Sequence, residues 1–331
     1  MNKYSKIPLT FLLRSGRVCT IKGTTNGRPA SSRTTEKERM LKMKKKNWIA
    51  LLLALVMMFA LAACGAKETP SDVPESANAL EKIKSEGVLT VTLSPDFSPM
   101  EFIDSSKQGQ EQYVGFDVTL AKYIAESLGV KLVIEPMSFD ACQSAVYTGS
   151  VPMSISGYSW TEERAQNYEL SDYYYAGENE TEQVLLIRKD DAAKYTKPED
   201  FDGQDVGAQN ASLQMQLVTD QLSKANPITI GDISVGVMEL KSGNIEALAV
   251  AKGNGEMIVD ANPDLVKCSW QFAVEEKYEA NLIIMAKGET ELLAAVNEAL
   301  AKAKAEGLYA KWYEEAVELG KSENAKELTL D

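Results

Sequence analysis

Histidine is absent from this sequence of 331 residues. Imidazole is the usual general base of Ser-His-Asp and Cys-His enzymes and a common ligand in zinc sites, so its absence excludes that catalysis and most zinc sites. The glycine-rich loops GxxxxGK[ST] and GxGxxG, which bind nucleotide phosphates, are missing as well. These absences favour a protein without catalytic residues, metal ion or cofactor.

Positive charge is scarce after the first 63 residues. Residues 1–63 hold 13 of the 35 lysines and arginines and 2 of the 48 acidic residues, so residues 64–331 carry a net charge of −24. Such an acidic body argues against nucleic acids and anionic lipids as partners, because their phosphates would be repelled. With 44% hydrophobic and 25% charged residues, the composition is that of a globular protein of one or two domains.

The longest apolar run is short for a membrane span. It begins at Ile49 and covers about 15 residues, whereas a bilayer needs about 20. Basic residues from Met43 precede it and small residues end it, which predicts a secretory signal peptide over 43–63; a short membrane anchor is the alternative. The ending Leu61-Ala62-Ala63-Cys64 resembles the bacterial lipobox, which implies cleavage before Cys64 and lipidation of its sulfur.

Two flanking segments follow from this interpretation. Residues 1–42 have no place before a signal peptide, so we interpret them as the product of a start codon assigned too early. Residues 64–77 are polar and lack periodicity, which predicts a flexible tether from the lipid anchor at the outer face of the cell membrane. Cys142 and Cys268 are the other cysteines of the mature chain, and we expect them unpaired because they fall in different lobes.

Strand-like and helix-like segments alternate after residue 77, which is typical of α/β folds with a largely parallel sheet. The alternation occurs twice and predicts two similar lobes, 78–184 plus 285–322 and 185–284, each a mixed sheet flanked by helices. Apolar strands at 185–187 and 282–284 are predicted to form the hinge between them. The other predicted strands are 89–93, 131–134, 151–156, 206–208, 228–230 and 245–250, and the helices are 118–128, 140–147, 212–222, 235–240 and 289–319.

Candidate binding residues follow the strand ends, where open α/β sheets bind ligands. Arg164 follows one strand and has a planar fork suited to a carboxylate. The helix after Ser212 offers the free N–H groups of its first turn to an anion. The aromatic residues that would form the walls are Phe97, Phe139, Tyr158 and Trp160. The alternatives are that Arg164 is a solvated helix residue, that the aromatic rings belong to the core and that Ser212 is only an N-cap.

A set of short motifs extends from about Leu80 to Trp312. They are Gly115-Phe116-Asp117-Val118, Ala121, Ile124-Ala125, Leu128-Gly129-Val130, Phe139-Asp140, Ser156-Gly157, Thr161-Glu162-Glu163-Arg164, Ser171-Asp172, Leu240-x-x-Gly243 and Asn262-Pro263-Asp264-Leu265. Together they resemble the bacterial extracellular solute-binding proteins of polar-amino-acid ABC importers. The resemblance implies a two-lobed, periplasmic-binding-protein-like fold (type II). Such a protein closes as a monomer on a free amino acid and delivers it to a membrane permease.

The resemblance also implies a role for each candidate residue. Arg164 is similar to the family's carboxylate-binding arginine. Gly157 is similar to the position whose carbonyl accepts from the ligand's ammonium, and Ser159 is similar to the hydroxyl that contacts both ends of the amino acid. The remaining implied contacts are Ser212 and Leu213 to the carboxylate, Phe97 and Phe139 as aromatic walls with Tyr158 beside them, and Ala251 at the end of the second-lobe strand.

Three positions depart from the family pattern. Ala251 stands where the family usually has the aspartate that pairs with the ammonium, and Ser94 and Pro152 replace two other common acids. Because an ammonium is costly to bury without a carboxylate, the first alternative is that another acid reaches it. The candidates are Asp96, Asp140 and Glu256. Otherwise Gly157, Ser159 and aromatic faces hold the amine, or the ligand is not an ordinary α-amino acid and Lys252 faces it.

The sequence thus predicts the ligand-binding component of an ABC importer rather than an enzyme. Two alternatives stay open. One is an exported enzyme on the same fold, such as a dehydratase acting on a prephenate-like acid, although no acid can be assigned beside the leaving group. The other is a ligand sensor for a surface receptor, which would share the site and differ in its partner.

Overall fold

The structure is a computed structural model, which describes residues 78–174, 182–278 and 280–326. All of these lie within one compact unit, Asp72–Asp331. The predicted signal peptide, the lipidated Cys64, the tether and residues 1–42 lie outside the described residues. Within the described ranges, no helix has the length and apolar character needed to cross a bilayer.

The first sheet has five strands in the order β4-β1-β5-β12-β6. Strand β1 runs parallel to β4 and β5, whereas β12 runs antiparallel to β5 and β6. The strands are β1 (Val88–Leu93), β4 (Lys131–Pro136), β5 (Met153–Ser159), β6 (Tyr168–Leu170) and β12 (Asn281–Ala286). The carboxyl ends of β1 and β5 therefore lie at the same edge of the sheet.

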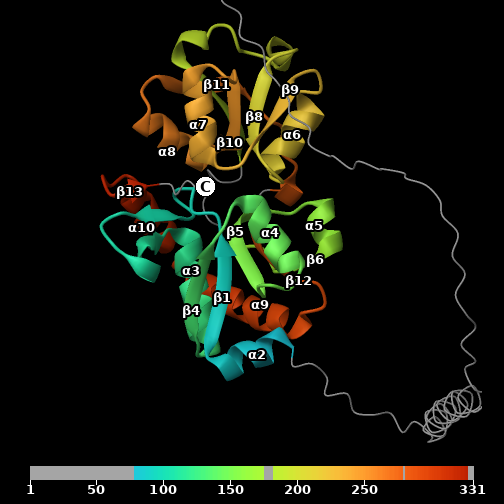
Figure 1. Ribbon diagram of the computed structural model, residues 1–331, viewed down its shortest axis with the longest axis vertical. Helices are drawn as coiled ribbons and strands as arrows, with labels where there is room; N and C mark the ends of the chain where they lie inside the picture. Colours follow the sequence, from blue (N-terminus) through green and yellow to red (C-terminus); the bar gives the residue numbers. More distant parts are fainter. Residues whose placement is uncertain (1–77, 175–181, 279, 327–331) are drawn as a thin grey trace, which may run out of the picture. The chain divides into compact units, whose positions relative to one another are not determined.

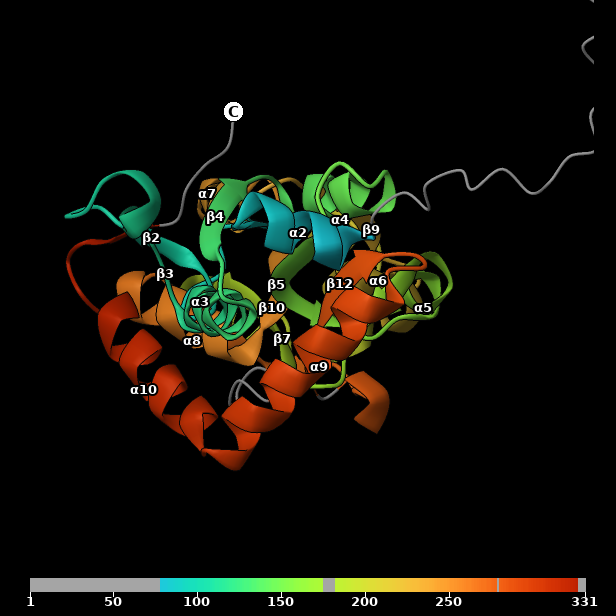
Figure 2. The same ribbon diagram turned by 90° about the horizontal axis from the view of Figure 1, so that it is seen from below.

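We call this sheet with its helices the first lobe. Among the described residues, its helices are α2 (Ala79–Glu86), α3 (Phe116–Leu128), α4 (Phe139–Tyr147), α5 (Glu162–Asn167), α9 (Thr290–Ala305) and α10 (Leu308–Gly320). Figure 2 shows α9 and α10 diverging from their shared end, with α3 beside them. The ring of Phe116 packs edge-on against Tyr309 and Trp312 of α10. Gly307 separates α9 from α10, and both helices contribute to the core of the first lobe.

The second sheet also has five strands, in the order β11-β7-β10-β8-β9. They are β7 (Gln183–Arg188), β8 (Asp205–Gln209), β9 (Asn226–Ile230), β10 (Ala247–Ala251) and β11 (Leu265–Gln271), and the helices beside them are α6 (Leu213–Gln221), α7 (Ile233–Ser242) and α8 (Lys252–Ala261) (Figure 1). Parallel pairing of β8 with β9 and β10 places the ends of β8 and β10 at one edge. We call this sheet with its helices the second lobe.

A small third sheet, in the order β13-β2-β3, lies apart from these two. Its strands are β2 (Phe102–Asp104), β3 (Tyr113–Val114) and β13 (Ala325–Lys326). The fold class is thus the predicted one, with two mixed α/β sheets flanked by helices.

The two strands predicted to form the hinge each belong to a single sheet. Among the described strands, β7 pairs with β10 and β11 of the second sheet, and β12 pairs with β5 and β6 of the first sheet. An isolated antiparallel bridge joins Tyr174 to Asn281, the first residue of β12. The predicted boundaries at 184/185 and 284/285 fall inside these strands, because an apolar strand does not reveal from its sequence which sheet it joins.

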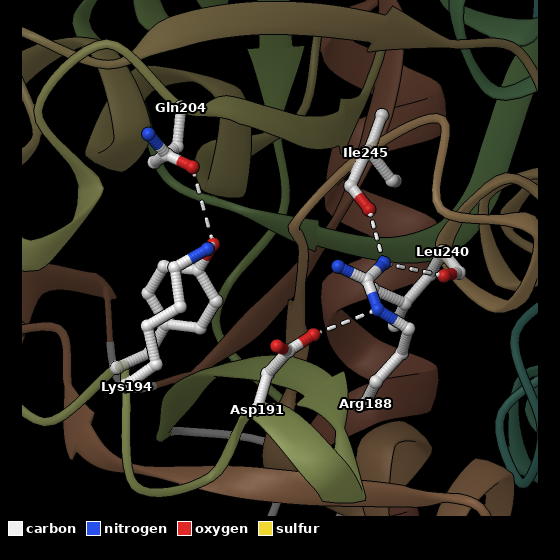
Figure 3. Close-up of polar contacts among 7 residues, drawn as sticks. Arg188, Asp191, Lys194, Gln204, Leu240 and Ile245 are labelled. Carbon is white, nitrogen blue, oxygen red and sulfur yellow. Dashed lines mark hydrogen bonds and ion pairs between the residues drawn. The ribbon is translucent and has the colours of Figure 1, made fainter.

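Arg188 at the end of β7 stabilises the turn between α7 and β10. Its Nη1 donates to the carbonyls of Leu240 (2.8 Å) and Ile245 (2.7 Å), and its Nε pairs with Asp191 at 2.8 Å (Figure 3). The Tyr195 hydroxyl accepts from Lys194 Nζ and donates to Gln204 Oε1 at 3.2 Å. Figure 3 shows Lys194 and Gln204 on either side of this hydroxyl. Because Ile187 pairs with Ala247 at the start of β10, the Arg188 contacts lie at the opposite end of this strand from Ala251.

Most predicted helices and strands exist, and the omissions have local causes. The helix predicted over 118–128 ends at Gly129 as expected, although it begins two residues earlier. Helix α8 was missed because it opens with Lys252-Gly253-Asn254-Gly255, and glycine and asparagine are poor helix formers. Cys142 and Cys268 are both unpaired, as predicted.

Candidate functional site

Arg164 lies in the first turn of α5, and its side chain is only 3% exposed. The guanidinium donates from Nε to Gln143 Oε1 at 3.1 Å and from Nη1 to the Ser159 carbonyl at 2.7 Å. Its Nη2 donates to the carbonyl of Ala211, in the second lobe, at 2.8 Å. Arg164 is therefore not a solvated helix residue; it connects the end of β5 to the segment that follows β8.

Within the described residues, none of the ion pairs includes Arg164. The rings of Tyr158 and Phe139 lie 5.1 and 5.5 Å from its guanidinium carbon instead. Burial lowers the pKa of Arg164 from 12.5 to about 10, so it stays protonated at neutral pH. A buried guanidinium bonded to neutral groups is well suited to an anionic ligand, because the ligand would supply the counter-charge.

Residues 209–212, which we call the bridging segment, make three hydrogen bonds to the first lobe. Gln209 donates to Asp96 at 3.0 Å and Asn210 donates to Asp140 at 2.9 Å. The Ala211 carbonyl accepts from Arg164 at 2.8 Å. Ala211 adopts a φ of 57°, a left-handed conformation that costs an alanine about 1–2 kcal/mol. The three bonds across the lobes offset that cost.

A small cavity of about 30 Å³ lies between the lobes at the strand ends. The first lobe contributes Asp96, Phe97, Glu101, Phe139, Ser156 and Gly157, and the second lobe contributes Gln209, Gln214, Ile233, Ala249, Val250 and Ala251. Four predicted site residues therefore share this cavity: Phe97, Phe139, Gly157 and Ala251. Its walls are aromatic and aliphatic, with carboxylates and amides between them.

Asp96 is the acid of this cavity that contacts both lobes. Its side chain is 1% exposed and accepts from Ser94 Oγ (2.8 Å), Gln209 Nε2 (3.0 Å) and the Ile233 N–H (2.7 Å). Burial raises the pKa of Asp96 to about 7, the Ile233 and Ser94 hydrogen bonds oppose that rise, and the negative charge of Asp232 adds to it. Sequence reasoning identified Asp96 only as one of three acids able to reach an amine.

Glu101 and Asp117 form a second, fully buried acidic pair that sequence reasoning gave no role. Burial and the neighbouring charge of Asp117 raise the pKa of Glu101 well above 4.5, and burial raises the pKa of Asp117 to about 7. Asp117 accepts from the Gly157 N–H (2.7 Å) and from the Tyr174 hydroxyl (2.8 Å). Ser156 Oγ donates to Glu101 at 2.5 Å. This pair thus positions the backbone of Gly157.

Arg164 and Ser212 line a separate groove of about 480 Å³ rather than the small cavity. Trp160 lies in the same groove, where Lys277 Nζ is 5.4 Å from its ring. Phe139 lies between the two spaces, since it lines the cavity and also contacts the guanidinium. The structure therefore divides the predicted site residues between two neighbouring spaces.

Three residues predicted to contact the ligand have side chains that line neither the small cavity nor the larger groove. Tyr158 is fully buried and its hydroxyl hydrogen-bonds Ser154 Oγ at 2.8 Å, so its placement does not support a direct role in the wall. Leu213 packs in the second-lobe core, and Ser159 takes part through its carbonyl. Ser212 does cap α6, because its Oγ accepts from the Met215 N–H at 3.1 Å.

The other proposed acids and the basic candidate are engaged elsewhere. Asp140 accepts from Ser138 and Asn210, and Glu256 forms an ion pair with Lys267 at 2.5 Å. Lys252 pairs with Glu182 at 2.5 Å, and it is not among the residues that line the cavity. Among the described residues, no cluster of three or more potential ligands could hold a metal ion.

The raised pKa of Asp96 has a measurable consequence for stability. Because its folded pKa of about 7 exceeds the unfolded value of 3.8, its contribution to stability is complete below pH 3.8 and is lost as the pH rises to 7. Relative to Asp96→Asn, which does not titrate, the wild-type free energy of unfolding should fall by about 2–4 kcal/mol between pH 4 and pH 8. Urea unfolding of both proteins over this range measures it; a constant or rising difference would contradict it.

Two helix-flanked sheets that share hydrogen bonds around an internal cavity define an α/β protein with two lobes. The chain belongs to the bacterial extracellular solute-binding proteins, family 3, because that family model matches residues 89–318. The similar proteins and solved structures are named as amino-acid-binding proteins, which argues against the exported dehydratase.

Three similar proteins illustrate the relationship. The arginine-binding extracellular protein ArtP of Bacillus subtilis is 29% identical over 275 residues, which cover 81% of this chain and 98% of ArtP. A probable histidine-binding protein of Campylobacter jejuni is 26% identical over 80% of this chain and 96% of its own length. The structure of AbpA from Streptococcus pneumoniae, bound to L-arginine, is 33% identical with a TM-score of 0.67, covering 73% of this chain and 100% of AbpA.

Proposed function

We propose that this protein binds a small amino acid between its lobes and delivers it to the transmembrane subunits of an ABC importer. The observation that carries the proposal is Arg164, a buried guanidinium between the lobes that has no ion pair among the described residues. Its planar fork suits the two oxygens of a carboxylate. Family membership and the amino acids in the names of the relatives support the same function.

The N-terminus of α6 would bind the same carboxylate from the second lobe. Ser212 Oγ satisfies the N–H of Met215, so the N–H groups of Leu213 and Gln214 belong to the first-turn donors that a helix leaves without an internal partner. These donors and the positive end of the helix dipole favour an anion. Ser212 and Leu213 would therefore act through the helix end and the backbone rather than through the Leu213 side chain.

Ligand binding would replace hydrogen bonds that now join the two lobes. A carboxylate beside Arg164 would compete with the Ala211 carbonyl for Nη2, while Gly157 and Ser159 would accept from the ammonium. A ligand shifts an open–closed balance only by its preference for the closed form. A micromolar affinity needs about −8 kcal/mol, which a bidentate pair, helix N–H bonds and burial beside Phe97 and Phe139 would supply.

We infer that the ligand is a cationic amino acid. Asp96 and Glu101 line the cavity, and no lysine or arginine is among the residues that line it in the described part of the chain. A positive ligand would gain from this environment and a negative one would be repelled. Relatives named for arginine and histidine fit this preference, although one relative is named for L-cystine.

We also propose that the protein is exported and held at the outer face of the membrane. The basic start at Met43, the short apolar run and the small residues before Cys64 support a signal peptide and lipidation of Cys64. Residues 64–77 would then be the tether. Delivery to a permease distinguishes this function from that of a surface-receptor sensor, which would use the same site.

A thermal-shift screen tests the binding function. The full chain, purified in mild detergent and refolded to remove bound ligand, would be heated with each of the twenty amino acids and with matched carboxylic acids that lack the amine. A ligand at one hundred times its dissociation constant adds about 2.7 kcal/mol of stability, and we expect the largest shift with L-arginine or L-histidine. Shifts only with acids that lack an amine, or with none of the compounds, would contradict the proposal.

A further inference from the structure

One of the two acids that line the cavity between the lobes, Asp96, accepts hydrogen bonds from both lobes. Glu101 also lines the cavity, and it accepts from Ser156 Oγ in the first lobe. Asp96 accepts from three neutral donors: a serine hydroxyl, an amide and a backbone N–H. A carboxylate has about four acceptor sites, so Asp96 retains the capacity to accept from one more group.

Asp96 lies where the amine of a bound ligand is expected. Asp96 lines the same cavity as Gly157, which is expected to accept from the ligand's ammonium, and as Ala251, whose methyl group cannot accept. Asp140 bonds to the bridging segment, and Glu256 pairs with Lys267, so neither lines the cavity. Of the three candidate acids, Asp96 is therefore the one that lines the cavity.

We propose that Asp96 binds the α-ammonium group of the ligand, in place of an acid at position 251 of the second lobe. The inference rests on the proposed function, and it adds the residue that selects for an amine. Two of the donors to Asp96, Gln209 and the Ile233 N–H, come from the second lobe. The ammonium would therefore pair with a carboxylate that the second lobe also holds, which couples amine recognition to closure.

Calorimetric titration of the full chain with three probes tests this assignment. L-Arginine has both cations, L-citrulline keeps the ammonium with a neutral side chain, and 5-guanidinopentanoate keeps the guanidinium without the ammonium. We expect Asp96→Asn to weaken L-arginine and L-citrulline by about 50-fold, a typical loss for a charged hydrogen bond, and to change 5-guanidinopentanoate by less than about 3-fold. Adding Ala251→Asp to Asp96→Asn should recover at least about 10-fold for the two amino acids.

Asp140→Asn is the matched control, since Asp140 also bonds to the bridging segment but lies outside the cavity lining. We expect any change it causes to be equal for the three probes. Equal losses of all three probes in Asp96→Asn would overturn the proposal and assign Asp96 to lobe contact alone. Loss of L-arginine with unchanged L-citrulline would overturn it in favour of the guanidinium. If the wild-type protein binds no amino acid, the proposed function itself fails.

Discussion

Arg164→Ala is expected to abolish amino acid binding while the chain still folds. The substitution removes the fork that would bind the ligand carboxylate, and two charge-assisted hydrogen bonds together contribute at least about 3 kcal/mol, or more than about 100-fold in affinity. It also leaves the carbonyls of Ser159 and Ala211 without their donor. We therefore expect the free energy of unfolding to fall by about 1–3 kcal/mol. Calorimetric titration with L-arginine and urea unfolding measure the two effects.

Two variants separate binding from stability. Arg188→Ala removes another arginine that donates to two backbone carbonyls, far along the strand from the cavity. It should lower stability to a similar degree and leave the affinity for L-arginine within about 2-fold. Arg164→Lys keeps the charge but loses the planar fork, so it should recover little of the affinity. Unchanged binding by Arg164→Ala would remove Arg164 from the site.

Gly115→Ala should cause the largest loss of stability among single-methyl substitutions at the described glycines. Gly115 has a φ of 120°, and a Cβ there would lie 2.3 Å from the carbonyl oxygen of Met100 and 2.7 Å from its carbon. Both atoms are backbone and cannot rotate away. We expect a loss of about 3–5 kcal/mol, because the clash adds to the cost of a φ that L-residues rarely adopt. Urea unfolding gives the value directly.

The clash at Gly115 would also disturb the candidate binding site. Met100 accepts from the Asp117 N–H at 2.9 Å, and Asp117 holds the Gly157 N–H, so a shift of these segments would disturb both acids of the buried pair. Gly87→Ala is the control, because Gly87 also has a positive φ of 69° but nothing within 4 Å of a Cβ. It should cost only about 1–2 kcal/mol. Equal effects of the two substitutions would show that the Met100 contact is unimportant.

Short-range patterns in the sequence predicted much of the fold. Apolar spacing placed the helix before Gly129, and a second alternation of the same kind predicted the second sheet. These predictions hold because helix periodicity and strand burial depend on residues close together in the chain. Arg164 was also identified from the sequence, because a planar cation one turn after a strand end is a local feature.

Other assignments depended on pairings between distant residues. Strands β7 and β12 look alike as apolar segments, and only their hydrogen-bonded neighbours show which sheet each joins. Tyr158 lies one residue from Gly157 but points into the core, because successive side chains of a strand alternate between faces. Which face is the core depends on packing that sequence spacing does not specify.

The sequence by itself determined the class of this protein: two α/β lobes, a family of solute-binding proteins and an arginine suited to a carboxylate. The tertiary structure determined which hydrogen-bond partners each of the three buried acids has. Asp96, Glu101 and Asp117 are similar carboxylates in the sequence, yet Glu101 accepts from Ser156, Asp117 from the Gly157 N–H and Asp96 from donors of both lobes, and burial raises the pKa of all three. The protonation and partners of a buried acid depend on desolvation and nearby charges, which exist only once the chain has folded.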